Sequence, residues 1–219
     1  MTFKQDLQSQ RDRSAAKFGP DRLAITEAET AALAPLIDAR KHPRVGDRAP
    51  NFVLPDALAR AVDLSDRLAN GPVVLNFYRG GWCPYCNIEL RAYQALLPRL
   101  IELGASLMAI SPQAPDDALT TVEKNALAFD VLSDHGSQVA ESYGLDFELS
   151  ERLRDIYIDI GNDLTTRNAA DEWRLPVPAT FVIAADGTIA FAHVEADYRE
   201  RADPGEVVEI LERLGKAAA

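Results

Sequence analysis

The sequence of 219 residues contains only two cysteines, Cys83 and Cys86, and only three histidines. Secreted scaffolds held together by disulfides carry more cysteines at wider spacing, so the sequence argues against this class. No two histidines stand at the spacing of a metal-binding motif, so a closed zinc site with four protein ligands would be hard to assemble. We therefore expect no bound metal and no other cofactor.

Basic side chains and long apolar runs are also scarce. The chain has 23 basic and 34 acidic side chains and a net charge of -11. A surface of this sign repels phosphate groups, so we expect neither nucleic acid nor a membrane as a partner. The longest apolar run, residues 73–78, is too short to cross a bilayer. Because the first residues show no apolar segment typical of a secretion signal, we expect the protein to be cytoplasmic.

The pattern of apolar residues divides the chain into an arm and a domain. Residues 1–44 predict an N-terminal helical arm, in which a capping box at Thr26 begins a second helix. Pro35 falls inside that helix and is expected to kink or split it. Residues 45–219 alternate strand-like and helix-like segments and are expected to form one domain.

Two buried strands, at residues 73–78 and 105–111, are separated by a helix with apolar side chains on one face. A right-handed crossover between these strands would make them parallel. Further along the chain, residues 180–184 and 189–193 are typical of a hairpin, and a final helix is expected to begin at Asp203. This order predicts an α/β protein with three layers.

The two cysteines lie directly after a buried strand, at the predicted start of the following helix. Unpaired backbone N–H groups and the positive end of the helix dipole face a side chain at such a position. They favour the thiolate, which is the reactive form of cysteine. Because Cys86 stands three residues after Cys83, the two sulfur atoms can also close a disulfide within the turn. These features predict catalytic redox chemistry at Cys83 and Cys86.

Residues 77–86, with the sequence FYRGGWCPYC, resemble the active-site segment of the thioredoxin superfamily. Five further segments resemble peroxiredoxin-like proteins of the alkyl hydroperoxide reductase/thiol-specific antioxidant family: residues 45–52, 109–112, 131–134, 143–145 and 177–183. The resemblance implies a thioredoxin-like three-layer α/β/α fold that follows the N-terminal helical arm. It also implies an antioxidant oxidoreductase that reduces a hydroperoxide or disulfide substrate with a thiol reductant such as thioredoxin or glutathione.

The active-site motif departs from the family pattern. Typical peroxiredoxins read P-x-x-x-T/S-x-x-C, and the last cysteine attacks the peroxide. On this register Cys86 takes the attacking position, Cys83 replaces the Thr/Ser, and Arg79 replaces the proline. A later arginine of the family falls here on Pro178. Thioredoxins place a cis-proline at that point, so we expect Pro178 to lie against the cysteines after a cis peptide bond with Val177.

Four neighbours of the cysteines are candidate substrate-binding residues. Arg79 could lower the pKa of a thiolate or orient a hydroperoxide oxygen, or it could be a solvated loop residue. Trp82 and Tyr85 could form a rim that faces the substrate, or could serve packing alone. Pro178 is the fourth candidate, because the thioredoxin pattern places it beside the disulfide.

Two enzymatic mechanisms fit the motif. In a peroxidase, one cysteine thiolate attacks the peroxide and becomes a sulfenic acid, and its neighbour condenses with it to a disulfide. The register favours Cys86 as the attacking residue, whereas exposure at the helix start favours Cys83. In a disulfide oxidoreductase, Cys83 would attack a substrate disulfide and Cys86 would resolve the mixed disulfide. The resemblance of the remaining domain favours the peroxidase.

A redox sensor without turnover is a third, non-enzymatic hypothesis, in which the disulfide changes association through the arm. We expect a homodimer, because homodimers are the commonest assemblies and the arm offers additional apolar surface. Residues 145–176 show no clear periodicity. Their position before Pro178 would let them wall the site, and they could equally form an interface.

Overall fold

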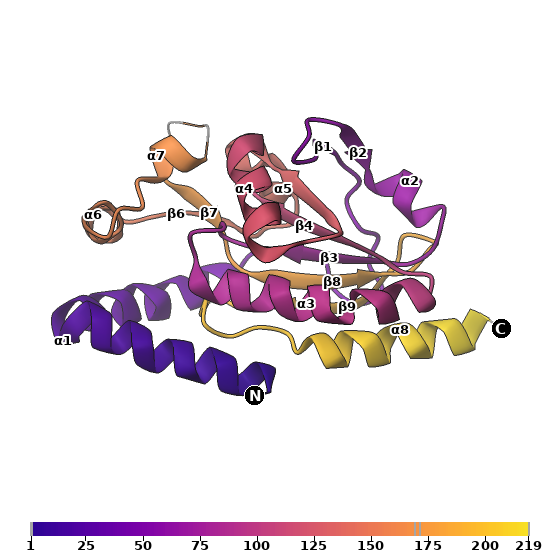
Figure 1. Cartoon of the computed structure of the whole chain (residues 1–219), viewed down its shortest axis with the longest axis horizontal. Helices are drawn as coiled ribbons and strands as arrows, with labels where there is room; N and C mark the ends of the chain where they lie inside the picture. Colours follow the sequence, from indigo (N-terminus) through magenta and orange to yellow (C-terminus); the bar gives the residue numbers. More distant parts are fainter. Residues whose placement is uncertain (1, 169, 171, 219) are drawn as a thin grey trace.

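The computed structural model describes residues 2–168, 170 and 172–218. At its centre lies a five-stranded sheet with the strand order β5-β4-β3-β8-β9 (Figure 1). The strands are β3 (Val73–Phe77), β4 (Ser106–Ser111), β5 (Asp130–Ser133), β8 (Ala179–Ile183) and β9 (Ile189–Val194). β3, β4 and β5 are parallel, whereas β8 is antiparallel to both β3 and β9. The predicted parallel pair and the predicted hairpin are therefore confirmed.

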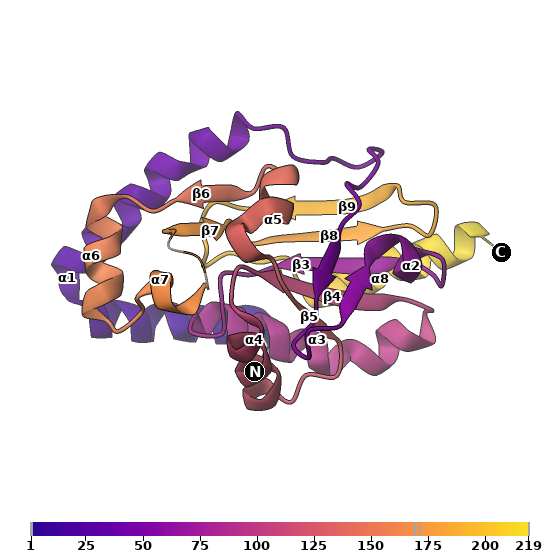
Figure 2. The same cartoon turned by 90° about the horizontal axis from the view of Figure 1, so that it is seen from above.

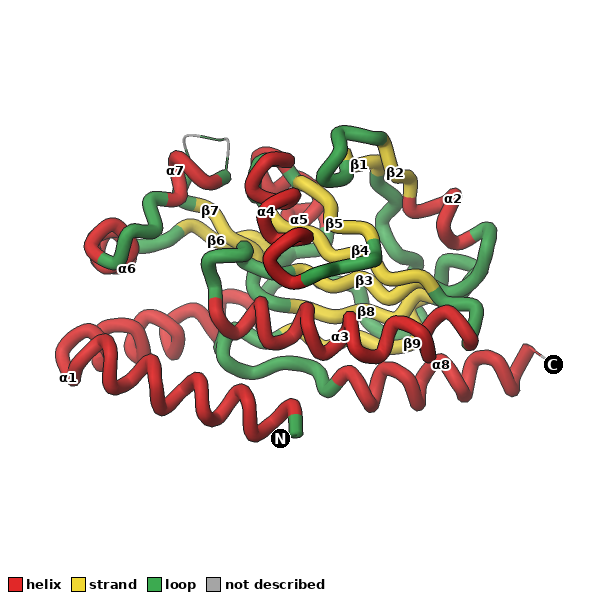
Figure 3. Tube along the Cα trace, in the orientation of Figure 1, coloured by secondary structure: helices red, strands yellow, loops and turns green. Residues whose placement is uncertain are grey.

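Helices and loops cover both faces of this sheet, and the inner strands β3 and β8 are consequently buried along their whole length (Figure 3). One face carries α3 (Pro84–Glu102), α4 (Pro115–Asn125) and α8 (Pro204–Ala218). The other face carries α2 (Leu64–Leu68), α5 (Gln138–Ser142) and the small sheet of β1 (Val53–Pro55) and β2 (Ala61–Asp63). A 3-10 turn, His135–Ser137, precedes α5. The predicted three layers are confirmed.

The arm forms α1 (Phe3–Asp38), and its details differ from the prediction. The helix begins after Thr2, whose side chain forms a capping box with Gln5. The expected start at Thr26 is wrong, because this hydroxyl donates to the Arg22 carbonyl inside the helix. Likewise the helix continues through Pro35 without a break.

The only non-helical backbone inside α1 is at Gly19, with φ 73° and ψ 169°. Pro20 follows it, and a proline disfavours the helical conformation of the residue before it. Glycine can adopt a positive φ without a steric penalty. The arm is therefore bent at Gly19 into two halves rather than at the position the sequence pattern suggested.

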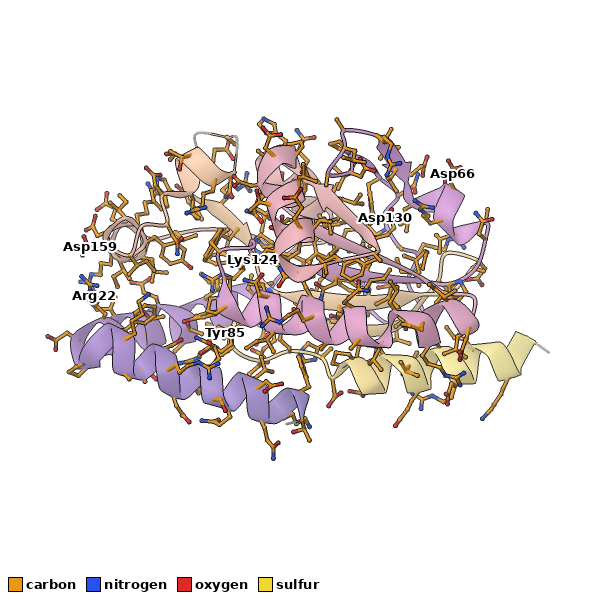
Figure 4. All side chains as sticks on the ribbon, viewed as in Figure 1. Arg22, Asp66, Tyr85, Lys124, Asp130 and Asp159 are labelled. Atoms are coloured by element: carbon orange, nitrogen blue, oxygen red, sulfur yellow. The ribbon has the colours of Figure 1, made fainter. Side chains whose placement is uncertain are left out.

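The two halves of α1 pack against different parts of the domain. The first half lies along α3, where Leu7 packs in the cluster that contains Tyr85. The second half lies beside α6 (Glu151–Asp159), as both views show (Figures 1 and 2). Arg22 of α1 forms an ion pair with Asp159 of α6 at 2.8 Å, and Figure 4 shows these two side chains facing each other at one end of the molecule.

Residues 145–176 form a small lobe at the same end of the molecule. The lobe contains β6 (Asp146–Glu148), α6, α7 (Leu164–Arg167) and β7 (Arg174–Pro176), with β6 and β7 paired antiparallel. Its interior is a separate apolar cluster around Leu149, Tyr157, Leu164 and Leu175, against which Trp82 packs. The lobe is thus attached next to the cysteine motif.

The predicted cis bond before Pro178 is wrong, since Val177–Pro178 is trans. The chain runs extended from β7 into β8 at this point, and the Val177 N–H donates to the Leu145 carbonyl at 2.9 Å. No tight turn is formed that would call for the less stable isomer. Among the described residues, no helix is long and apolar enough to cross a membrane.

The connection before β3 generates a stability prediction. Gly71 has φ 144°, and a Cβ at this position would overlap the carbonyl oxygen of Gly104. Gly71→Ala should therefore destabilise the protein by about 3 kcal/mol, because the overlapping atom belongs to the backbone and cannot rotate away.

Gly104→Ala is the matched control. Gly104 also has a positive φ, 71°, but a Cβ there would meet nothing within 4 Å. Only the backbone strain remains, about 1 kcal/mol. Urea unfolding of both variants measures the difference, and equal losses of stability would contradict this explanation.

Candidate active site

The two cysteines occupy the start of α3 as predicted. Cys83 is the N-cap residue, with an extended backbone, and Pro84 takes the first helical position. Both thiols are free, and Cys83 and Cys86 are 1% and 0% exposed. The Asn87 side chain donates to the carbonyls of Gly81 and Cys83, at 2.7 and 3.0 Å. These bonds hold the loop before the cysteines against the first turn of the helix.

The preceding loop is packed too tightly for side chains at its glycines. The Gly81 N–H donates to Gln113 Oε1 at 2.7 Å, and a Cβ on Gly81 would overlap the Thr121 side chain. The loop is therefore fixed by β4 and α4 on one side and by α3 on the other.

Arg79 lies inside the site and is not a solvated loop residue. It is buried, and its guanidinium carbon lies 4.2 Å from the ring centre of Tyr198 and 5.3 Å from that of Trp82. Such stacking holds a cation in a partly dry environment through the ring quadrupoles. Its Nε is buried and has no hydrogen-bond partner among the described residues.

A buried ion pair lies behind the cysteines. Arg201 Nε donates to Glu89 Oε2 at 2.8 Å, and both side chains are 1% exposed. The same guanidinium lies 3.5 Å from Cys86 Sγ through its Nη2. Asn76 Nδ2 donates to the second oxygen of Glu89 at 2.9 Å. Arg201 therefore connects a buried carboxylate with a thiol.

Sequence reasoning missed both members of this pair. The position of Glu89 carried a usable signal, since a residue three places after Cys86 lies on the same face of the helix. Arg201 carried none, because it stands in the irregular segment between β9 and α8, 115 residues from Cys86.

The environment separates the two thiols by their pKa. Burial alone would raise the pKa of Cys83, but a hydrogen bond from Cys86 and the positive charges of Arg79 and Arg201 outweigh it and lower the pKa to about 6. Burial, the hydrogen bond to Cys83 and the negative charge of that residue raise the pKa of Cys86 well above its usual value. These opposite shifts favour the thiolate at Cys83 and the thiol at Cys86.

Glu89 titrates in an unusual range for a carboxyl group. Burial raises its pKa to about 7, although the Arg201 charge and the Asn76 hydrogen bond favour the ionised form. A carboxyl with this pKa can take up or release a proton at neutral pH, and Arg201 lies between it and the Cys86 sulfur.

A cavity of about 540 Å³ opens onto Cys83. Its lining includes five of the six site residues proposed from the sequence: Arg79, Trp82, Cys83, Tyr85 and Pro178. Cys86 does not line the cavity and lies behind Cys83. The cavity continues between α1 and α6, and the part of the lobe between residues 147 and 162 walls it. Within the described part of the chain, no group of three or more side chains could hold a metal ion.

Comparisons with known proteins identify the family. The family model described as "AhpC/TSA family" matches residues 45–192. Peroxiredoxin Q from chloroplasts of Oryza sativa subsp. japonica is 33% identical over 146 residues, which cover 62% of this chain and 65% of that protein. The thiol-disulfide oxidoreductase ResA of Bacillus anthracis is 33% identical over 103 residues, which cover 47% of this chain. The chain thus spans only 58% of the length of this ResA protein.

Solved structures show the same fold. Peroxidoxin BcpB from Mycobacterium tuberculosis superposes with a TM-score of 0.62 at 24% identity, covering 78% of this chain and 98% of its own. A mutant of PrxQ from Xylella fastidiosa superposes with a TM-score of 0.61 at 20% identity, covering 82% and 100%. The predicted thioredoxin-like α/β/α fold with an N-terminal helical arm is confirmed.

The contacts of Arg201 generate a prediction about the reactive thiol. Arg201→Leu should raise the pKa of Cys83, because it removes a cation that stabilises the thiolate, and less thiolate should be present at neutral pH. Titration of the thiolate by its ultraviolet absorbance measures this change. Arg201→Lys keeps a positive charge and should retain part of the lowering, even where the leucine variant folds poorly because Glu89 is left unpaired.

Arg199→Leu is the matched control. This arginine stands two residues away, pairs with Asp197 at 2.7 Å and contacts neither thiol. The Arg199→Leu substitution should leave the pKa of the Cys83 thiol unchanged. An unchanged titration in Arg201→Leu would show that the charge of Arg201 does not determine the state of Cys83.

Proposed function

The chain belongs to the AhpC/TSA family, and on this premise we propose that it is a thiol-dependent peroxidase that reduces hydroperoxides through a Cys83/Cys86 dithiol–disulfide cycle. The observation that carries the proposal is the position of Cys83. This residue combines a lowered pKa with access to the cavity, and a second thiol lies directly behind it. Relatives named peroxiredoxin Q and peroxiredoxin Bcp support the same activity.

In the first step the Cys83 thiolate attacks the terminal oxygen of the hydroperoxide. An S–O bond forms, the O–O bond breaks, and the leaving alkoxide takes up a proton and departs as an alcohol. Cys83 is thereby oxidised to a sulfenic acid, and the hydroperoxide is reduced by two electrons. Arg79 would orient the peroxide, while Trp82, Tyr85 and Pro178 would form the surrounding wall.

In the second step Cys86 condenses with the sulfenic acid. Its sulfur attacks the Cys83 sulfur, an S–S bond forms, the S–O bond breaks, and hydroxide leaves as water. Cys86 must lose its proton in this step. This proton passes to the departing hydroxide, which thereby leaves as water, and Arg201 stabilises negative charge on the Cys86 sulfur. A cellular thiol such as thioredoxin or glutathione would then reduce the disulfide.

Cys83 is the better candidate for the attacking residue, although the register of the family motif favours Cys86. A hydroperoxide in the cavity would meet Cys83 first, because Cys86 does not reach the lining. The order of the two pKa values points the same way, since the thiolate is the nucleophile.

A disulfide oxidoreductase is the second candidate function. It is favoured by the C-x-x-C pair at the helix start and by the similarity to ResA proteins, which are named thiol-disulfide oxidoreductases. In that reaction Cys83 would attack a substrate disulfide, and Cys86 would release the reduced product.

We further propose that the protein is a cytoplasmic homodimer. Each subunit consists of an arm, residues 1–44, and a thioredoxin-like domain, residues 45–219. The sequence has no cysteine outside the active pair, which supports a reducing compartment. Six large apolar side chains are at least half exposed and could lie at an interface: Leu36, Val45, Val53, Leu58, Ile101 and Ile158. The family match begins at residue 45, which supports the proposed boundary.

Rapid mixing of the reduced protein with hydrogen peroxide tests the peroxidase and its attacking residue. Cys83→Ser should abolish fast oxidation, because it removes the nucleophile. Cys86→Ser should retain the fast first step and stop at a sulfenic acid on Cys83, which a trapping reagent and mass spectrometry identify. Trp82 contacts the active-site cluster and should report the oxidation by its fluorescence.

The two variants also separate the alternatives. Fast oxidation that survives in Cys83→Ser but not in Cys86→Ser would reverse the assignment of the two cysteines. Oxidation of the unmodified protein no faster than that of an ordinary thiol would reject the peroxidase and favour disulfide exchange.

A further inference from the structure

The cavity beside Cys83 is much larger than the smallest peroxide requires. A water molecule occupies roughly 30 Å³ of liquid, and hydrogen peroxide is only slightly larger. The cavity measures about 540 Å³, within the range of pockets that bind whole organic ligands. Most of its volume is therefore available to a part of the substrate that does not react.

The walls away from Cys83 are largely apolar and come from the arm and the lobe. The lining includes Phe18, Leu33 and Leu36 of α1 together with Leu153, Ile156 and Ile160 at α6. The ion pair Arg22–Asp159 joins these two helices at one end of the molecule (Figure 4), and α1 bends at Gly19. The apolar walls thus depend on the arm, which lies outside the family match, residues 45–192.

The charges around the cavity disfavour an anionic ligand tail. Glu29, Glu148 and Glu151 are among the lining residues. Arg154 also lines the cavity, but it is paired with Glu148 and donates to the Leu149 carbonyl. Apart from Arg79 beside Cys83, the described lining residues therefore offer no unpaired cation to a carboxylate.

We propose that this cavity binds the uncharged, apolar body of a bulky organic hydroperoxide, with its peroxide group at Cys83 and Arg79. The inference rests on the proposed peroxidase function and names the substrate class of the same site. Apolar walls gain free energy when they bury a hydrocarbon, whereas a carboxylate there would lose hydration without gaining a partner. The enzyme selects uncharged hydroperoxides over anionic ones of equal length.

The test compares two substrates that differ only in charge. A long-chain hydroperoxy fatty acid and its methyl ester, both below their aggregation concentrations, are mixed with the reduced full-length protein without a reductant. The second-order rate constant for oxidation should be about tenfold higher for the ester. Equal rate constants, or a faster acid, would overturn the inference while a fast reaction with hydrogen peroxide leaves the peroxidase intact.

A pair of isoleucines at α6 provides the second arm of the test. Ile160 is half-buried and lines the cavity, whereas Ile158 is 53% exposed and does not line it. Ile160→Trp fills part of the cavity, so the ratio of the ester rate constant to that of hydrogen peroxide should fall about tenfold. Ile158→Trp is the control and should leave both rate constants unchanged.

The outcomes distinguish the inference from the function on which it rests. An unchanged ratio of the ester rate constant to that of hydrogen peroxide in Ile160→Trp overturns the inference. The inference also fails if Ile160→Trp slows only the reduction of the disulfide by thioredoxin, because the cavity would then bind the reductant. If Ile160→Trp does not fold, the comparison of ester and acid still decides. If no hydroperoxide reacts faster with the reduced protein than with an ordinary thiol, the proposed function itself fails.

Discussion

The chemistry of this site depends on one buried ion pair, Arg201–Glu89, placed against Cys86. Two opposite charges without water are costly to bury, and a pair of this kind is weak evidence for stability. Its position gives it a different use. The guanidinium stabilises negative charge on either sulfur, and the carboxyl group titrates near neutral pH. The pair can therefore favour the thiolate at Cys83 and the thiol at Cys86, which are the states that a two-cysteine cycle requires.

The arm and the lobe complete the site from the other side. The lobe places the Tyr157 ring 5.6 Å from the Arg79 guanidinium, and the arm and the lobe together surround the approach to Cys83 with apolar side chains. Excluding water strengthens the attraction between the arginines and the thiolate, because less of the field is screened. The same walls determine which molecules reach the sulfur. Reactivity and selectivity thus have separate structural sources, the core of the domain for one and α1 with α6 for the other.

Local signals predicted local structure well. The strand before Cys83, the hairpin of β8 and β9, and the cap of α8 at Asp203, which accepts from the Gly205 N–H at 2.9 Å, follow from neighbouring residues alone. The bend at Gly19 was not predicted, because the apolar pattern pointed to Pro35 as the break, and the helix accommodates this proline. The trans bond at Pro178 depends on pairing with Leu145, and Arg201 reaches Cys86 across the fold. Such long-range contacts leave no trace in residue spacing.

The central claim is that the protein makes Cys83 the thiolate and keeps Cys86 protonated. Nuclear magnetic resonance of the reduced protein, with 13C at the β-carbons of both cysteines, follows the two thiols separately during one pH titration. The account predicts that the Cys83 signal shifts first, well below the pH at which an ordinary thiol ionises, and that Cys86 follows only far above it. A first ionisation at Cys86, or a joint titration near the ordinary thiol value, would contradict it.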